Sequence, residues 1–203
     1  MIDERKIKTA LQQALGFPSH DEVQASRSQV EAWYASTAPL LRWAATPSPL
    51  GDVYIAVSER GLVALEFGIP EQQFLGGLDV QARLLHDPEH LTSYLEEITE
   101  YFAGRRARFD LPVDWTRMPP FQQEVLRQTS AIPQGQVWTY AQVAQSIGRP
   151  KAARAVGTAL ARNPVPIIIP CHRVIGSDGA MHGYGGHGGI ETKRWLLRFE
   201  GAL

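Results

Sequence analysis

The sequence lacks several features that would place it in other classes of protein. With a single cysteine, Cys171, the 203-residue chain can form neither an internal disulfide nor a zinc site built from several thiolates. No apolar run approaches the roughly 18 residues of a membrane-spanning helix. The N-terminal stretch MIDERKIKTALQQ is charged and lacks the apolar block of a signal peptide. We therefore expect a cytoplasmic protein in a reducing compartment, with no membrane association.

What the chain does contain is typical of a globular protein with an uneven charge. Apolar residues make up 44% and charged residues 20%, which excludes disordered and collagen-like classes and permits a buried core. Residues 1–116 carry 10 lysines and arginines against 17 aspartates and glutamates, whereas residues 117–203 carry 10 against 4. The basic half suits an anionic partner, although two differently solvated surfaces would give the same balance.

The apolar pattern divides the chain into three segments. We expect a helical extension over 1–36, a small α+β domain with an antiparallel sheet over 37–112, and a mostly helical domain over 117–203. Strand patterns at 52–57 and 62–67 predict a β-hairpin. A proline-bearing stretch that is typical of a linker separates the second and third segments.

The third segment contains a predicted helix-turn-helix of winged-helix-like type. Thr139 and Gln142 match a capping box, and Pro150 suits the first turn of the following helix. That helix, Lys151-Ala-Ala-Arg-Ala-Val-Gly157, places small side chains around one long cation. Small residues and free N-terminal amides favour close approach to phosphate, but tight helix–helix packing would use the same small residues. Further helices are expected at 91–102, 121–130 and 190–199.

The only thiol follows a short apolar strand that ends at Pro170. An isolated cysteine is usually an inert core residue, but a neighbouring base or cation such as His172 or Arg173 can lower the pKa of a thiol. Adjacent residues of an extended chain face opposite ways, so contact between Cys171 and His172 needs a water bridge or a turn at Pro170.

These residues form a motif with a known counterpart. Pro170-Cys-His-Arg-Val174, preceded by Asn163-Pro-Val-Pro, resembles the cysteine motif of the O6-alkylguanine-DNA alkyltransferases, also called methylated-DNA–protein-cysteine methyltransferases. The resemblance is close over 117–203 and holds in outline over 40–112. It also includes Thr139-Tyr140-Ala, Lys151–Gly157, Gly183-Tyr184, Arg194-Trp-Leu-Leu197 and Glu200.

The resemblance implies DNA repair by direct reversal. The alkyl group of O6-alkylguanine, with O4-alkylthymine as a further substrate, would pass to Cys171 in a single-turnover suicide reaction that uses no cofactor and no metal. The damaged base would first flip out of the duplex, because its alkylated atom is inaccessible inside. The implied partner is double-stranded DNA, bound from the minor groove by a monomeric protein.

The resemblance also implies roles for single residues. Tyr140 would push on the phosphate and donate a proton to the leaving base, while His172, relayed by water and oriented by Glu200, would take the thiol proton. Asn163 would brace the turn before Cys171. Read singly, Tyr140, Asn163 and Glu200 are also compatible with packing, turn and surface roles. The predicted DNA-binding residues are Tyr140, Ala153, Arg154, Ala155 and Gly157, and those of the alkylguanine pocket are Val174, Tyr184 and Gly185.

One loop departs from the family pattern. The loop 183–190 is about two residues longer than usual, and some relatives have a serine where Gly185 offers only backbone donors. We expect this loop to form one wall of the alkyl pocket and either to widen it or to let His187 reach the lesion or its phosphates.

Two other functions compete with alkyl transfer. Non-catalytic alkyltransferase-like lesion binders replace the cysteine, usually with tryptophan, so the presence of Cys171 speaks against them. A cysteine hydrolase would also pair a thiol with a histidine, but it would need neither the Arg154 helix nor the basic half.

Overall fold

The structure is a computed structural model that describes residues 16, 18–79 and 81–203. It separates into two compact units, 1–39 and 40–203. The described part of the first unit contains the helix α2 (His20–Thr37), which begins at a capping box formed by Ser19 and Glu22. The helical pattern predicted before residue 16 lies outside the described residues. Within the described part of the chain, no helix has the length and apolarity needed to cross a bilayer.

The second unit begins with a four-stranded sheet in the order β3-β2-β1-β4. The strands β1 (Leu40–Thr46), β2 (Val53–Ser58) and β3 (Gly61–Phe67) are antiparallel neighbours, and β2–β3 is the predicted hairpin. The edge strand β4 (Arg83–His86) instead pairs parallel with β1, which makes the sheet mixed. All four β4 residues are exposed, so no alternating apolar pattern marks this strand in the sequence.

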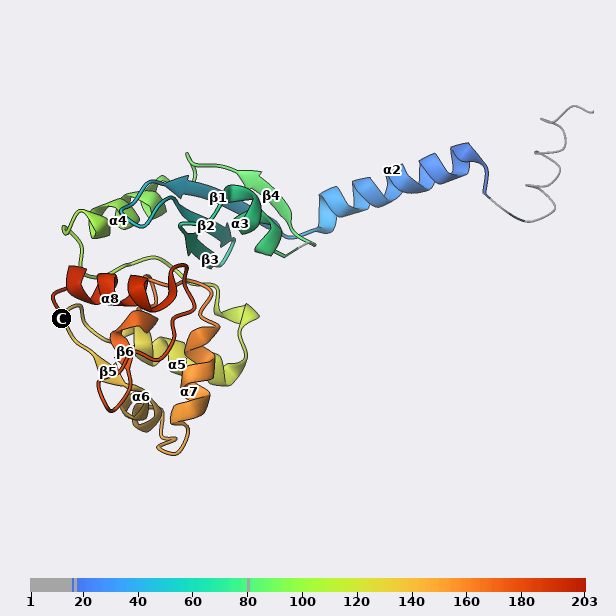
Figure 1. The fold of residues 1–203 in the computed structure, drawn as a ribbon. Coiled ribbons are helices and arrows are strands. Elements are labelled where there is room, and N and C mark those ends of the chain that lie inside the picture. Colours follow the sequence, from blue (N-terminus) through green and yellow to red (C-terminus); the bar gives the residue numbers. More distant parts are fainter. Residues whose placement is uncertain (1–15, 17, 80) are drawn as a thin grey trace, which may run out of the picture. The chain divides into compact units, whose positions relative to one another are not determined.

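Two helices accompany the sheet (Figure 1). The helix α3 (Glu71–Gly77) follows β3 and buries Phe74. The helix α4 (Thr92–Phe102) packs against β1 and buries Ile98 and Tyr101. Beyond α4, a loop that includes the 3₁₀ turn η1 (Trp115–Arg117) leads into the helical domain.

The helical domain contains four α-helices and a two-stranded parallel ribbon. Helix α6 begins at the predicted capping box of Thr139 and Gln142. Pro150, in contrast, precedes α7: residues 149–152 form a separate turn, and the helix begins only at Ala153. The elements are α5 (Pro120–Ser130), β5 (Trp138–Thr139), α6 (Tyr140–Ser146), α7 (Ala153–Ala161), β6 (Val174–Ile175) and α8 (Gly189–Phe199). The predicted class, a sheet domain followed by a mostly helical domain with a helix-turn-helix, is confirmed.

One hydrophobic core joins the sheet domain to the helical domain. Leu65 and Phe67 of β3 belong to the same buried cluster as Leu126 of α5 and Leu196 of α8. Cys171 is a member of this cluster too. The cysteine motif therefore lies where the two domains pack together, and residues from both domains can reach it.

Candidate active site

The segment before Cys171 is a tight loop fixed by Asn163. The side-chain amide nitrogen Nδ2 of Asn163 donates to the carbonyl of Ile169 at 2.8 Å and lies 3.2 Å from Cys171 Sγ, while its Oδ1 accepts from the Val165 amide at 3.2 Å. Ile167 adopts φ = 75°, a left-handed conformation that is costly for a β-branched residue. The surrounding contacts hold this strained loop and so set the position of the thiol.

Cys171 begins a 3₁₀ turn, η2 (Cys171–Arg173), directly after Pro170. A turn therefore replaces the extended chain in which Cys171 and His172 would face opposite ways. The thiol is buried, and this burial raises its pKa; the hydrogen bond from Asn163 and the positive charge of Lys193 oppose the rise. The sequence pattern favoured a lowered pKa, but at this depth desolvation outweighs the neighbouring donors and charge.

A fully buried carboxylate cluster lies behind this turn. Glu200, at the end of α8, accepts two hydrogen bonds from Arg173, at 2.8 Å to each carboxylate oxygen, and one from the Tyr101 hydroxyl at 2.7 Å. Nε2 of His172 lies 3.0 Å from Glu200 Oε1. Both ring nitrogens of His172 are buried, and among the described residues neither has a partner in hydrogen-bonding geometry, so the 3.0 Å approach of Nε2 to Glu200 is a close contact between the two groups.

The charges of this cluster follow from burial and pairing. Burial alone would raise the pKa of Glu200, but His172 and Arg173 outweigh it and lower the pKa to about 2. Burial lowers the pKa of His172, and the adjacent Glu200 only partly reverses this effect. The arrangement therefore holds a neutral imidazole against a charged carboxylate. Such an imidazole can accept a proton, because the resulting cation would lie 3.0 Å from Glu200 Oε1.

Three members of this neighbourhood were missed from sequence. Tyr101 comes from α4 in the sheet domain, and Arg173 was read only as a neighbour of the thiol. Lys193 of α8 is almost completely buried, and its Nζ donates to the Val174 carbonyl at 2.6 Å. Burial lowers the pKa of Lys193 while the nearby Cys171 raises it. A lysine within an amphipathic helix gives no sequence signal that it points inward.

The ribbon β5–β6 brings Tyr140 to the cysteine turn. Trp138 and Thr139 of β5 pair in parallel with Val174 and Ile175 of β6, directly after the cysteine turn, and Nζ of Lys193 lies 5.9 Å from the centre of the Tyr140 ring. The Tyr140 hydroxyl donates to the carbonyl of His182 at 2.9 Å. Burial, and then the nearby Cys171, raises the pKa of Tyr140. Tyr140 is therefore a neutral donor close to the thiol.

Helix α7 presents the predicted cationic face to solvent. Arg154 and Ala155 are exposed, and the N-terminal end of the helix has no side-chain cap. Gly157 faces Tyr140, because a Cβ atom built on Gly157 would lie 3.7 Å from Cε1 of the tyrosine ring. The structure thus places α7 and Tyr140 next to each other, with the long side chain of Arg154 outside.

Two of the three predicted pocket residues, Val174 and Tyr184, lie near Cys171, and the third, Gly185, lies against the end of α7. Val174 is buried and its carbonyl already accepts from Lys193. The hydroxyl of Tyr184 is buried without a hydrogen-bond partner among the described residues, and its pKa is raised by burial and then by Cys171. Gly185 lies so close to the end of α7 that a Cβ there would be 2.7 Å from the Ala161 carbonyl oxygen.

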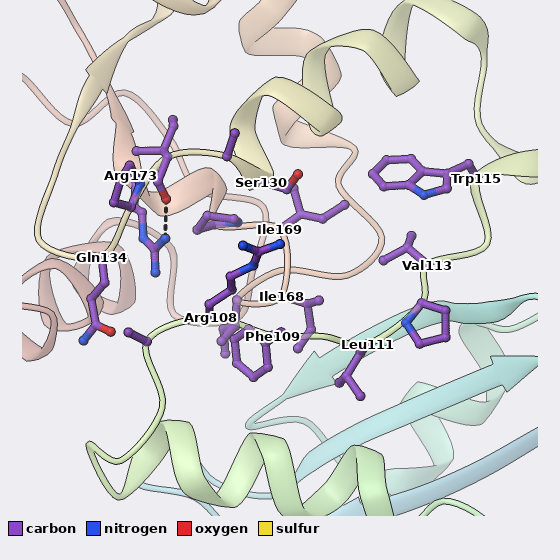
Figure 2. A pocket seen from close by; sticks show the side chains of 17 residues that line it. Arg108, Phe109, Leu111, Val113, Trp115, Ser130, Gln134, Ile168, Ile169 and Arg173 are labelled. Carbon is purple, nitrogen blue, oxygen red and sulfur yellow. Dashed lines mark hydrogen bonds between the residues drawn. The ribbon is translucent and has the colours of Figure 1, made fainter.

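A separate cavity of about 760 Å³ lies on another side of the cysteine loop (Figure 2). Its walls are the linker from 107 to 115, the end of α5 with the following residues 131–134, and residues 167–170, with Arg108 extending into it. Cys171, Tyr140 and Tyr184 are not among its lining residues. It is therefore distinct from the predicted alkylguanine pocket. Among the residues that the structure describes, no cluster of three or more His, Cys, Asp or Glu could hold a metal ion.

Comparison with known proteins agrees with this geometry. Residues 41–115 match the family model described as 6-O-methylguanine DNA methyltransferase, ribonuclease-like domain, and residues 120–202 match the corresponding DNA binding domain. The chain is 40% identical to the methylated-DNA–protein-cysteine methyltransferase of Shigella flexneri over 77% of this chain and 93% of that protein. It is 38% identical to the Methanosarcina barkeri protein of the same name, over 75% of this chain and 92% of that protein.

Solved structures lead to the same group of proteins. The crystal structure of Mycobacterium tuberculosis OGT in complex with DNA superposes with a TM-score of 0.68 at 36% identity, covering 79% of this chain and 93% of that one. A structure of the O6-methylguanine methyltransferase of the same organism gives a TM-score of 0.67, covering 80% of this chain and 92% of that one. Both halves of the second unit and the geometry around its only thiol lead to one conclusion: the chain belongs to the 6-O-methylguanine DNA methyltransferase family.

Proposed function

We propose that this protein repairs alkylated DNA by direct reversal, moving the alkyl group of O6-alkylguanine onto Cys171. The observation that carries the proposal is the position of the only thiol. It lies 3.2 Å from the Asn163 amide nitrogen, at the start of a turn whose next residue is paired with Glu200. Relatives that this chain covers over more than nine-tenths of their length are named for this reaction. Because the acceptor must stay a free thiol, we also propose that the protein works in a reducing, cytoplasmic environment.

The first step removes the thiol proton. Nε2 of His172 lies 3.0 Å from Glu200 Oε1, so we propose the other ring nitrogen, Nδ1, as the one that accepts the proton, through one bridging water. The imidazolium that forms is stabilised by the charged Glu200, which Arg173 and Tyr101 hold in place. Glu200 therefore acts by orienting and stabilising the base.

The second step is a displacement at the alkyl carbon. The Cys171 thiolate forms a carbon–sulfur bond as the bond from that carbon to the guanine oxygen breaks, and the base gains a proton at a ring nitrogen. We propose the Tyr140 hydroxyl as the donor, which then leaves the His182 carbonyl that it contacts here. The products are unmodified guanine and an S-alkylcysteine. A thioether has no ready route back, so each protein molecule reacts once.

DNA would be bound as a duplex by the α7 face of a monomer. The exposed Arg154 would enter the base stack from the minor groove and fill the gap left by the flipped base. The small residues Ala153, Ala155 and Gly157 would let the helix approach the backbone closely, with its uncapped N-terminal amides near phosphate. The solved DNA complex of a relative supports DNA as the partner. We assign this binding and the transfer to residues 117–203, with the sheet domain over 37–112 contributing Tyr101.

The flipped base would lie against Val174, Tyr184 and Gly185. The carbonyls of Cys171 and Val174 each accept one hydrogen bond within the protein, from the Val174 amide and from Lys193. Each carbonyl oxygen has a second lone pair for the guanine amino group. The unpartnered hydroxyl of Tyr184 is a further polar group that a bound base could engage.

Intact-mass measurement tests the proposal. The parent protein is mixed with a duplex that carries O6-methylguanine, and with the same duplex without the lesion as a control. We expect a gain of one CH₂ per protein molecule, found in the peptide that contains Cys171, only with the damaged duplex. An unchanged mass, or repeated turnover by one protein molecule, would contradict the proposed reaction.

A further inference from the structure

The glycine-rich loop that follows the cysteine motif packs against the sheet domain. Beyond β3, a Cβ atom built on Gly68 would lie 2.9 Å from Cδ2 of His187, so the imidazole rests directly on the backbone at Gly68. One residue earlier in the loop, Gly186 is buried, and a Cβ there would lie 2.8 Å from Cζ of Phe67. The sequence left two roles open for this loop, a wider alkyl pocket or contact of His187 with the lesion or its phosphates, and in the structure His187 lies against the backbone of the sheet domain.

The same short segment touches the predicted alkyl pocket. A Cβ on Gly186 would lie 2.6 Å from Cε1 of Tyr184, and a Cβ on Gly185 would lie 2.7 Å from the Ala161 carbonyl oxygen. Three consecutive residues, 185–187, thus connect the end of α7, the wall residue Tyr184 and the end of β3. Neither Gly185 nor Gly186 has room for a side chain, so their backbone atoms form these contacts.

An acidic residue of β3 lies in the same place. Glu66 and His187 line one cavity of about 420 Å³ together with Gly185 and Gly186. Half-burial raises the pKa of Glu66, and the charge of His187 opposes that rise, which indicates that the two groups sense each other. The contact of His187 with Gly68 therefore lies beside a half-buried carboxyl group that lines the same cavity.

We propose that His187 is a positioning residue that sets the range of alkyl groups accepted: packed on Gly68 beside Glu66, it ties the Tyr184–Gly186 wall of the pocket to the sheet domain. This inference rests on the proposed alkyl transfer at Cys171. Residues 183–189 include five glycines, and glycine loses more backbone freedom than any other residue when it becomes ordered. The order of this wall therefore depends on the contacts that the loop makes with its neighbours. Loss of the imidazole frees the wall and admits bulkier groups.

The test compares methyl and benzyl transfer. Single-turnover rates are measured for O6-methylguanine and O6-benzylguanine in the same duplex, with the parent, His187→Ala, His187→Phe and Glu66→Gln. We expect His187→Ala to raise the benzyl-to-methyl rate ratio by about fivefold, because a small change in pocket size alters discrimination by about tenfold. His187→Phe keeps a ring on Gly68 and should restore most of the parental ratio, and Glu66→Gln should shift it less. His90→Ala is the matched control, an exposed histidine of the sheet domain that should leave the ratio unchanged.

A second measurement does not depend on catalysis. Amide hydrogen exchange over 183–189 should speed up in His187→Ala and not in His90→Ala, while both variants keep the parental melting temperature. An unchanged benzyl-to-methyl ratio in His187→Ala, or unchanged exchange in that loop, overturns the inference and leaves the proposed function intact. Absence of alkyl transfer by the parent protein is the separate result that overturns the proposed function, and the selectivity inference with it.

Discussion

The two functional regions of this protein are built on opposite principles. The cluster around Glu200 is fully buried, takes residues from both domains and satisfies its carboxylate with three neighbouring side chains. The outer face of α7 is exposed, comes from one short helix and leaves Arg154 in solvent. Burial in the first region makes charge costly and therefore fixes its position. Exposure in the second leaves a cation available to a partner. We propose that the first region carries the chemistry and that the second binds the duplex.

Removal of the thiol should have the largest effect. Cys171→Ser should bind methylated duplex as the parent does but transfer methyl at least about a thousandfold more slowly, because an alcohol is far less ionised than a thiol. Gel-shift affinity and single-turnover transfer are measured on the same duplex. Sustained methylation of the variant would show that the acceptor lies elsewhere.

Neutralising the buried carboxylate of Glu200 should have the next largest effect. Glu200→Gln keeps the shape but removes the charge that stabilises protonated His172, and we expect transfer to fall by about a hundredfold from every substrate. Transfer rates are compared with duplex affinity, which should not change. A parental rate in the variant would mean that His172 works without Glu200.

The same residue predicts how stability depends on pH. The pKa of Glu200 is lowered from 4.5 to about 2 in the folded protein, so its contribution is fully present above pH 4.5 and is lost as the pH falls toward 2. The loss should be on the order of 3 kcal/mol. The free energy of unfolding of the parent, measured with denaturant between pH 4.5 and pH 2, should fall by this amount. In Glu200→Gln, the dependence of the unfolding free energy on pH should lack this contribution. Equal slopes would contradict the assignment.

Removing one donor to the cluster should have a smaller effect. Tyr101→Phe deletes the hydroxyl that donates to Glu200 from α4, and hydrogen bonds to charged groups contribute about 2 kcal/mol. We expect the free energy of unfolding to fall by that amount and transfer to slow only modestly. Tyr94→Phe, on the same helix, is the control, and a loss of equal size there would mean that the bond to Glu200 is not the cause.

Sequence alone predicted the elements with strong local patterns. The hairpin β2–β3, the capping box at Thr139 and the helices of the third segment follow from periodicity and capping chemistry, which involve neighbours along the chain. The edge strand β4 was missed because its exposed residues carry no alternation. The start of α7 was placed too early because Pro150 fits a turn as well as a first helical position.

The candidate site divides in the same way. The motif around Cys171 led to His172, Asn163 and Glu200, and the structure brings these residues together. Tyr101 and Lys193 were missed because their inward direction depends on packing between segments that are far apart in sequence. The raised pKa of Cys171 could not be foreseen either, since it depends on burial and not on the neighbouring residue types.

One measurement tests the separation of chemistry from binding most directly. Alkyl transfer to Arg154→Ala and to Glu200→Gln is measured from a duplex and from the free modified base. Arg154→Ala should transfer alkyl groups from the duplex about a hundredfold more slowly, because the few kcal/mol that unstacking the base costs are no longer offset. Its rate of transfer from the free base should not change. Glu200→Gln should lose the same factor on both. Equal losses of Arg154→Ala on duplex and free base would contradict the account, because the exposed face of α7 would then act on the chemistry itself.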